Sequence, residues 1–125
     1  MKKLQENIIK EWNNKKGPVV FTTVGKNGVP NAIYASCVSL FDRRTILIAD
    51  NYFDKTKRNI LSGGMASVLF ITEEDKSYQI KGTLSYHKSG PFFDDMKEWN
   101  PPEHPGRGAV SIEVDEVYSG SEKIL

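Results

Sequence analysis

The chain has 125 residues, of which 38% are hydrophobic and 26% charged, and its formal net charge is +1 at pH 7. This length suits one domain with a hydrophobic core, and this composition excludes a disordered or collagen-like chain. A net charge this close to zero argues against recruitment of nucleic acid or an anionic membrane by overall electrostatic attraction. The charge is uneven, because residues 1–58 carry eleven basic and five acidic side chains (+6) whereas residues 59–125 carry six and eleven (−5). The first half is therefore suited to an anionic ligand.

The single cysteine, Cys37, excludes an intramolecular disulfide and every zinc motif with several cysteines. It lies in an apolar-rich stretch, which predicts a buried structural thiol. No segment reaches the ~18–20 apolar residues that a membrane-spanning helix needs. Charges at Glu6, Lys10 and Glu11 interrupt any signal-peptide core. We therefore expect a soluble protein of the cytoplasm.

The first half of the chain begins with one helix and continues as strands. Apolar residues at four-residue spacing predict an amphipathic helix over residues 3–14. β-Branched and aromatic residues then predict strands over 19–24, 32–41 and 45–49. Asn27-Gly28 separates the first two strands and is a strong hairpin signal. We interpret these three strands as an antiparallel meander.

The second half alternates between short helices and strands. Asp54 is a favourable N-cap for a helix that reaches residue 61, and Gly63-Gly64 ends it. Strict alternation of side chains predicts a strand over 77–87. The remaining expected elements are strands over 66–72 and 109–117 and a helix over 91–99. Six strands and three short helices indicate a mainly β protein whose single domain, residues 1–125, is an antiparallel barrel or strongly curled sheet.

The chain lacks the usual signatures of catalysis. It has no glycine-rich phosphate loop and no dinucleotide-binding glycine motif. Its two histidines, His87 and His104, are too few for a metal site, and we expect His87 on the exposed face of its strand and His104 in a loop. Asp94-Asp95 falls in the first turn of a helix, where the helix dipole explains the two carboxylates. No catalytic residue and no metal site are therefore assigned.

One segment does point to a ligand. Asp54-Lys55-Thr56-Lys57-Arg58 opens a helix after a strand and a short connector. Unpaired backbone N–H groups and partial positive charge at a helix N-terminus suit a phosphate. Lys55 adds a positive charge there, and Thr56 adds a hydroxyl donor. A solvated basic helix face explains the same pattern, so the residues alone leave both interpretations open.

The layout as a whole resembles the FMN-binding split-barrel proteins related to pyridoxamine 5′-phosphate oxidase, especially the short bacterial FMN-binding proteins. The resemblance covers nearly the full chain and depends on the order and spacing of short motifs. These motifs are Gly17-Pro18-Val19-Val20-Phe21-Thr22-Thr23, Asn27-Gly28-Val29-Pro30-Asn31-Ala32, Thr45-Ile46-Leu47-Ile48-Ala49-Asp50, Asp54-Lys55-Thr56-Lys57-Arg58-Asn59-Ile60 and Gln79-Ile80-Lys81-Gly82-Thr83-Leu84. The resemblance implies a six-stranded antiparallel split β-barrel that forms a homodimer, with FMN in a groove between the subunits.

The resemblance also implies a set of cofactor-binding residues. Carried over by position, Lys55 and Thr56 would bind the FMN phosphate, and Ser36 would be a further polar phosphate ligand. The backbone that would run along the isoalloxazine ring belongs to Ile48, Ala49 and Asp50. Some short relatives carry an aromatic residue beside the flavin where this chain has Ala35.

The expected function is that of an FMN-dependent oxidoreductase with a small-molecule or protein redox partner. The flavin itself supplies the redox chemistry, which accords with the lack of a nucleophile or general base. The arginine-rich substrate ligands of the larger oxidase are not evident, which argues against pyridoxamine phosphate as the substrate. The alternative is a split barrel that binds a deazaflavin or no cofactor.

Two further points stay open at the level of sequence. A small barrel that binds single-stranded nucleic acid would use surface aromatic residues such as Tyr34, Tyr52, Phe53 and Tyr78, but the acidic second half of the chain disfavours it. The proline-rich loop from Asn100 to Gly108 either borders the flavin or crosses the barrel end.

Overall fold

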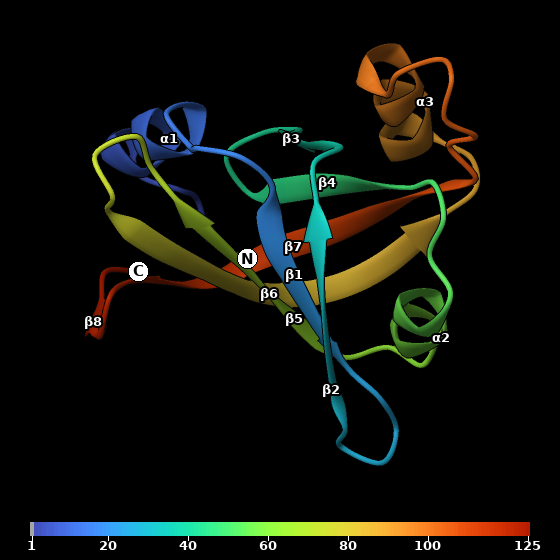
Figure 1. Cartoon of the computed structure of the whole chain (residues 1–125), viewed down its shortest axis with the longest axis horizontal. Coiled ribbons are helices and arrows are strands. Elements are labelled where there is room, and N and C mark those ends of the chain that lie inside the picture. Colours follow the sequence, from blue (N-terminus) through green and yellow to red (C-terminus); the bar gives the residue numbers. More distant parts are fainter. Residues whose placement is uncertain (1) are drawn as a thin grey trace.

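Strand-forming segments recur along the chain after Pro18, and in the computed structural model, which describes residues 2–125, these segments form one antiparallel sheet (Figure 1). The elements in chain order are α1 (Glu6–Asn13), β1 (Val19–Val24), β2 (Pro30–Ala35), β3 (Val38–Leu40), β4 (Thr45–Asp50), α2 (Lys55–Leu61), β5 (Met65–Ile71), β6 (Ser77–His87), α3 (Pro91–Trp99), β7 (Gly108–Ser119) and β8 (Glu122–Lys123). The predicted mainly β fold is confirmed. The helix expected over 3–14 begins later, at Glu6.

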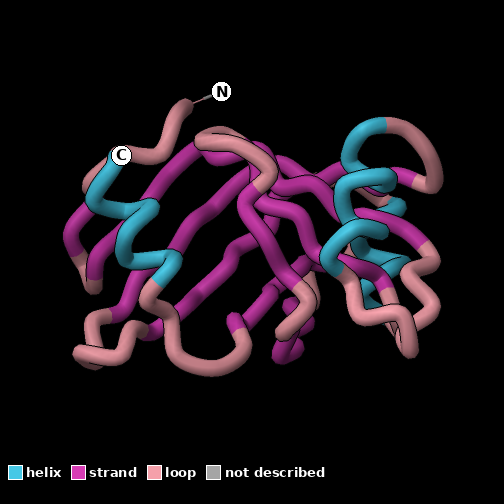
Figure 2. The backbone as a smooth tube through the Cα atoms, turned by 90° about the horizontal axis from the view of Figure 1, so that it is seen from above, coloured by secondary structure: helices cyan, strands magenta, loops and turns pink. Residues whose placement is uncertain are grey.

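The sheet follows the order β2-β1-β5-β6-β7-β4-β3, and β8 pairs with the end of β7. Its two terminal strands, β2 and β3, are consecutive in the chain and are joined only by Ser36 and Cys37. The sheet must therefore curl until its ends meet, and Figure 2 shows this curled arrangement from above. The result is a split barrel, in which the chain connects β2 to β3 but no ladder pairs these two described strands.

The strand predicted over residues 32–41 is wrong as a single element. Its first part is β2, which pairs with β1, whereas its second part is β3, which pairs with β4. The predicted meander of three strands is wrong for the same reason. At the break, Val38 N–H donates to the Ser36 carbonyl (3.1 Å) and Ala49 N–H donates to the Cys37 carbonyl (3.0 Å). This split and the short β8 raise the number of strands among the described residues from the expected six to eight.

The core fills the inside of the curled sheet. In β6, Tyr78, Ile80 and Leu84 are buried while their neighbours are more exposed, as the predicted alternation requires. Every residue of β4 is buried. Each fully buried aliphatic side chain stabilises the fold by about 1.5–3 kcal/mol relative to exposure. Trp12 of α1 covers one end of the barrel, where its ring meets the ring of Phe70 edge to face at 5.3 Å.

His87 does not lie on an exposed face as the sequence suggested. Its Nε2 lies 2.8 Å from the Ser111 hydroxyl, and its ring packs edge to face against Phe92 of α3 at 4.9 Å. The alternation of β6 placed His87 on the outer face correctly, but α3 covers that face. Burial lowers the pKa of the His87 imidazole.

This burial makes the stability of the protein depend on pH. Because the folded state disfavours the imidazolium, protons bind more strongly to the unfolded chain, whose histidine titrates near ~6.5. The contribution of the neutral His87 imidazole to the free energy of unfolding is thus complete above about pH 6.5. It declines as the pH falls from there through the lowered pKa of the folded state. We expect the free energy of unfolding, measured by chemical denaturation between pH 7.5 and 5.5, to fall less in His87→Gln than in the wild type. Equal pH slopes for the two proteins would contradict this account.

Candidate functional site

The buried carboxylate of Asp50 organises one end of the barrel. Asp50 is the last residue of β4, and its side chain is 0% exposed. Its Oδ1 accepts hydrogen bonds from Phe53 N–H (3.0 Å) and from the Arg107 guanidinium (3.1 Å), and its Oδ2 accepts one from the Tyr86 hydroxyl. A buried carboxylate needs such partners because burial removes its hydration. Burial and the hydrogen bond to Asp50 raise the pKa of the Tyr86 hydroxyl, which therefore stays protonated and donates.

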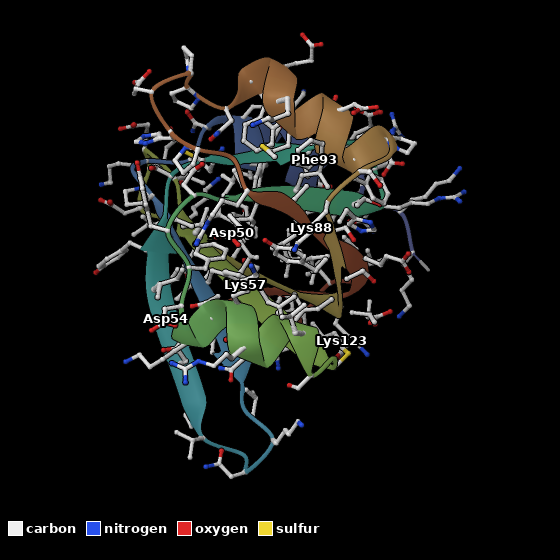
Figure 3. The ribbon with its side chains drawn as sticks, turned by 90° about the vertical axis from the view of Figure 1, so that its right-hand side faces the viewer. Asp50, Asp54, Lys57, Lys88, Phe93 and Lys123 are labelled. Carbon is white, nitrogen blue, oxygen red and sulfur yellow. The ribbon has the colours of Figure 1, made fainter. Side chains whose placement is uncertain are left out.

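The same cluster fixes the connector between β4 and α2, residues 51–54. Arg107 donates to the Phe53 carbonyl (2.8 Å) as well as to Asp50, and its own backbone N–H donates to the Asp50 carbonyl (2.8 Å). In Figure 3, Asp50 and Lys57 lie near one another above α2, and Asp54 lies at the start of that helix. The Lys57 ammonium is 5.3 Å from the ring centroid of Tyr86, so α2 also contacts the cluster.

The proline-rich loop after α3 is held against this connector. The buried amides of Asn51 and Asn100 exchange two hydrogen bonds (2.9 and 3.1 Å), and Gly106 N–H donates to the Asn51 side chain (2.9 Å). Lys97 of α3 donates to the carbonyls of Pro105 and Gly106 (3.0 and 3.2 Å). The loop is therefore tethered at several points along its length.

A groove of about 320 Å³, here called the first groove, lies between the connector and this loop. Its lining residues are Tyr34, Ser36, Cys37, Ala49, Asn51, Tyr52, Phe53 and His104. The Tyr52 hydroxyl lies 3.3 Å from Nδ1 of His104, so connector and loop also meet through their side chains. Cys37 is only partly buried and lines the groove, so the prediction of a buried structural thiol is wrong.

A separate cavity, here called the basic groove, lies where α2 meets the hairpin of β1 and β2. It has a volume of about 340 Å³. Its lining residues are Gly25, Asn27, Val29, Pro30, Asn31, Lys55, Arg58 and Asn59. Lys55 is exposed, while Thr56 is 3% exposed and its hydroxyl accepts a hydrogen bond from Asn31 (2.8 Å). Asp54 takes the predicted N-cap position of α2, but its carboxylate pairs with Arg58 (3.3 Å) instead of capping the backbone.

The predicted site residues fall into three groups. Lys55 lines the basic groove and Thr56 is hydrogen-bonded to one of its walls. Ser36 and Ala49 line the first groove, so one chain does not bring Ser36 beside Lys55 in a single cavity. The two remaining residues, Ile48 and Asp50, have buried side chains and offer only backbone to a ligand.

Sequence reasoning missed the residues that complete the first groove and its support. Asn51 and Tyr52 carried a weak signal, because they are polar and follow a strand of mostly apolar residues. Asn100, His104 and Arg107 carried no signal beyond their place in the proline-rich loop whose role the sequence left open, because only the folded loop brings them to the connector. The proline-rich loop from Asn100 to Gly108 contributes to the first groove, because His104 lines it.

Over residues 2–125 there is no group of three or more His, Cys, Asp and Glu side chains able to hold a metal ion. None of the helices in this described stretch is long and apolar enough to cross a membrane.

We predict that Asp50→Asn destabilises the fold by about 1–3 kcal/mol, because the amide leaves the Arg107 charge unpaired and cannot accept all three hydrogen bonds. Asp94→Asn makes the same change at an exposed position of α3, where it loses only an interaction with the helix dipole, and should cost less than about 1 kcal/mol. Urea denaturation of the three proteins measures the difference. Equal stability of Asp50→Asn and the wild type would show that the cluster does not hold this end of the barrel.

Comparison with known proteins places these features in a family. The family model described as pyridoxamine 5′-phosphate oxidase matches residues 6–120. An uncharacterized protein of Methanocaldococcus jannaschii is 33% identical over 123 residues, which cover 94% of this chain and 80% of that protein.

Solved structures share the fold at lower identity. HupZ of Group A Streptococcus superposes with a TM-score of 0.83 at 20% identity, with 96% of each chain covered. An FMN-binding protein of Syntrophomonas wolfei superposes with a TM-score of 0.75 at 20% identity, covering 94% of this chain and 97% of its own. The haem storage protein HutZ of Vibrio cholerae has the same fold, with a TM-score of 0.66 at 14% identity, and 93% of this chain and 94% of HutZ are covered. An F420 reductase also has it, with a TM-score of 0.65 at 12% identity, and 84% of this chain and 91% of the reductase are covered. Since the family model spans most of the chain, this protein belongs to the pyridoxamine 5′-phosphate oxidase family.

Proposed function

We propose that this protein binds FMN without a covalent bond, at the interface of a homodimer, and uses it in oxidation–reduction. The observation that carries the proposal is a pair of cavities lined by successive parts of one segment, the first groove by the connector and the basic groove by the start of α2. One cavity is basic and the other is partly aromatic. FMN has the matching chemistry, because a phosphate dianion is attached through a chain to a flat ring system. Family membership and the FMN-binding protein of Syntrophomonas wolfei support the same choice.

The basic groove fits the phosphate end. Lys55 and Arg58 line it, and Lys55 has no carboxylate within ion-pair distance among the described residues. An exposed ammonium of this kind suits a charge-assisted hydrogen bond to phosphate. Because α2 has only seven residues, the side-chain cations and not the helix dipole carry most of this attraction. Thr56 accepts from Asn31 and keeps its own hydroxyl proton for an acceptor.

The first groove fits the ring end. Ala49 contributes a small side chain to its floor, while Tyr34, Tyr52 and Phe53 contribute aromatic surface. A cofactor site of this kind is mostly apolar, with a few fixed polar groups that orient the ligand. The buried Asp50 cluster holds the connector in place, so the wall of the groove is formed before a ligand arrives. When bound, the flavin supplies reversible hydride and single-electron transfer.

The proposed dimer would use an apolar face on the outside of the barrel, defined here by Val20 of β1, Ala32 and Tyr34 of β2, and Leu69 of β5. Val20 lies opposite both Tyr34 and Leu69 in the strand register, so these side chains are neighbours on one face. Tyr34 is 78% exposed and Leu69 is 41% exposed. A contiguous exposed apolar face marks an interaction surface. Tyr34 also lines the first groove, so a second copy that covers this face would border the flavin.

Removal of the Lys55 charge should weaken FMN binding. We expect Lys55→Ala to raise the FMN dissociation constant at least tenfold, which corresponds to about 1.5–3 kcal/mol for a charge-assisted hydrogen bond. The dissociation constant is read from the change in flavin fluorescence on titration. Riboflavin, which lacks the phosphate, should bind the variant and the wild type equally.

Lys76→Ala provides the matched control, because it removes the same charge at an exposed turn that lines neither groove. Unchanged FMN affinity in Lys55→Ala would exclude Lys55 from the site. Competition with haemin and with F420 tests the choice of cofactor, and displacement of FMN by either compound at lower concentration would overturn it.

The proposed dimer has its own test. The wild type should have twice the 14.1 kDa mass of the chain in analytical ultracentrifugation. Leu69→Lys places a charge in the apolar face and should shift the protein towards the monomer, whereas Ser77→Lys, at an exposed position outside that face, should not. A wild-type monomer loaded with flavin would refute the shared site.

A further inference from the structure

Next to the first groove lies a cavity that the proposed FMN site does not use, here called the second groove, with a volume of about 350 Å³. Small-molecule sites typically measure ~300–1,000 Å³. The two grooves are contiguous, because Ser36, Cys37 and His104 line both of them. The walls that belong to the second groove alone include Ser39 of β3 and, at the end of α3, Trp99 and Pro101.

The walls of the second groove are held in place by hydrogen bonds. The Trp99 indole N–H donates to Asp95 one turn earlier in α3 (3.1 Å), which restrains the ring. His104 N–H donates to the Pro101 carbonyl (3.0 Å) and closes a tight turn. Between these residues, Asn100 is fixed by its amide exchange with Asn51. A preformed cavity loses little conformational entropy when a ligand enters.

The chemistry of the second groove differs from that of the basic groove. Among its lining residues, all of which lie in the described part of the chain, there is no Lys, Arg, Asp or Glu. A charged ligand would therefore give up its hydration with no opposite charge to replace it. Trp99 and Pro101 offer flat apolar surface, while the hydroxyls of Ser36 and Ser39 and the His104 imidazole offer hydrogen bonds. These features select an uncharged, flat and weakly polar ligand.

We propose that the second groove binds an uncharged planar aromatic compound that carries a hydroxyl or carbonyl group, edge to edge with the occupant of the first groove. Because the two grooves share Ser36, Cys37 and His104, two ligands bound in them would contact the same side chains. That this compound is the second substrate of the flavin rests on the proposed function. The binding itself does not.

The test uses 2-naphthol as an uncharged probe and 2-naphthalenesulfonate as its charged counterpart. Each is titrated by calorimetry into the full chain, with and without saturating FMN. We expect 2-naphthol to bind one site per chain in both states and to bind at least fivefold more tightly than the sulfonate. Ser39→Trp fills the second groove alone and should weaken 2-naphthol binding at least tenfold, with FMN affinity changed by less than twofold. Ser77→Trp adds the same bulk at an exposed strand position outside both grooves and should bind the probe like the wild type.

Ser39 pairs with Leu47 in the sheet, so a bulky residue at this position can prevent folding. Trp99→Leu is therefore the second variant. It removes the aromatic wall of the second groove and should also weaken binding of 2-naphthol. Any of three results would overturn the proposal. These are the absence of measurable 2-naphthol binding, equal binding of 2-naphthol to the wild type and the folded variants, and displacement of FMN by 2-naphthol. The two proposals fail separately. If FMN does not bind, the proposed function fails, whereas titration of the flavin-free protein still decides whether the second groove takes the probe.

Discussion

The buried carboxylate of Asp50 is the constraint on which this end of the barrel depends. A carboxylate with no exposed surface is stable only if donors replace its lost hydration. The three donors come from different parts of the chain, namely Phe53 in the connector, Tyr86 in β6 and Arg107 at the end of the loop. Gly108 lets Tyr86 approach, because a Cβ at that position would lie 2.5 Å from the Tyr86 ring. The carboxylate therefore fixes both segments that enclose the first groove.

The sequence predicted the features that depend on local pattern. The helix expected over 54–61 is α2, the helix over 91–99 is α3, and the alternation in 77–87 is the burial pattern of β6. Each of these signals is contained within a few neighbouring residues. The position of Lys55 at the start of α2 followed from the same local pattern, and its place in a cavity is consistent with the proposed role.

The features that the sequence did not predict depend on contacts between distant segments. The pattern in 32–41 is continuous, and nothing local shows that its two parts pair with strands at opposite ends of the sheet. His87 was placed on the correct face of β6, but α3 covers that face with Phe92. His104 reaches the first groove because contacts between distant segments hold the loop in place, among them the hydrogen bond from Gly106 N–H to Asn51 in the connector.

The fold by itself does not decide which ligand is bound, since proteins named for FMN, haem and F420 share it. The choice lies with the side chains that line the cavities. Among the described residues, the basic groove is lined by Lys55, which has no carboxylate partner, aromatic residues line the first groove, and the lining of the second groove includes no Lys, Arg, Asp or Glu. This separation of charged and uncharged surfaces along one segment is what favours a ligand with an anionic end and a flat end.

The most direct test of this account is the absorbance spectrum of the purified protein after incubation with FMN and removal of unbound flavin by desalting. The account predicts that the bands of oxidised flavin remain with the protein, at one FMN per chain. A colourless protein that has released all the added FMN would contradict the central claim, and the basic groove would then be an ordinary solvated surface.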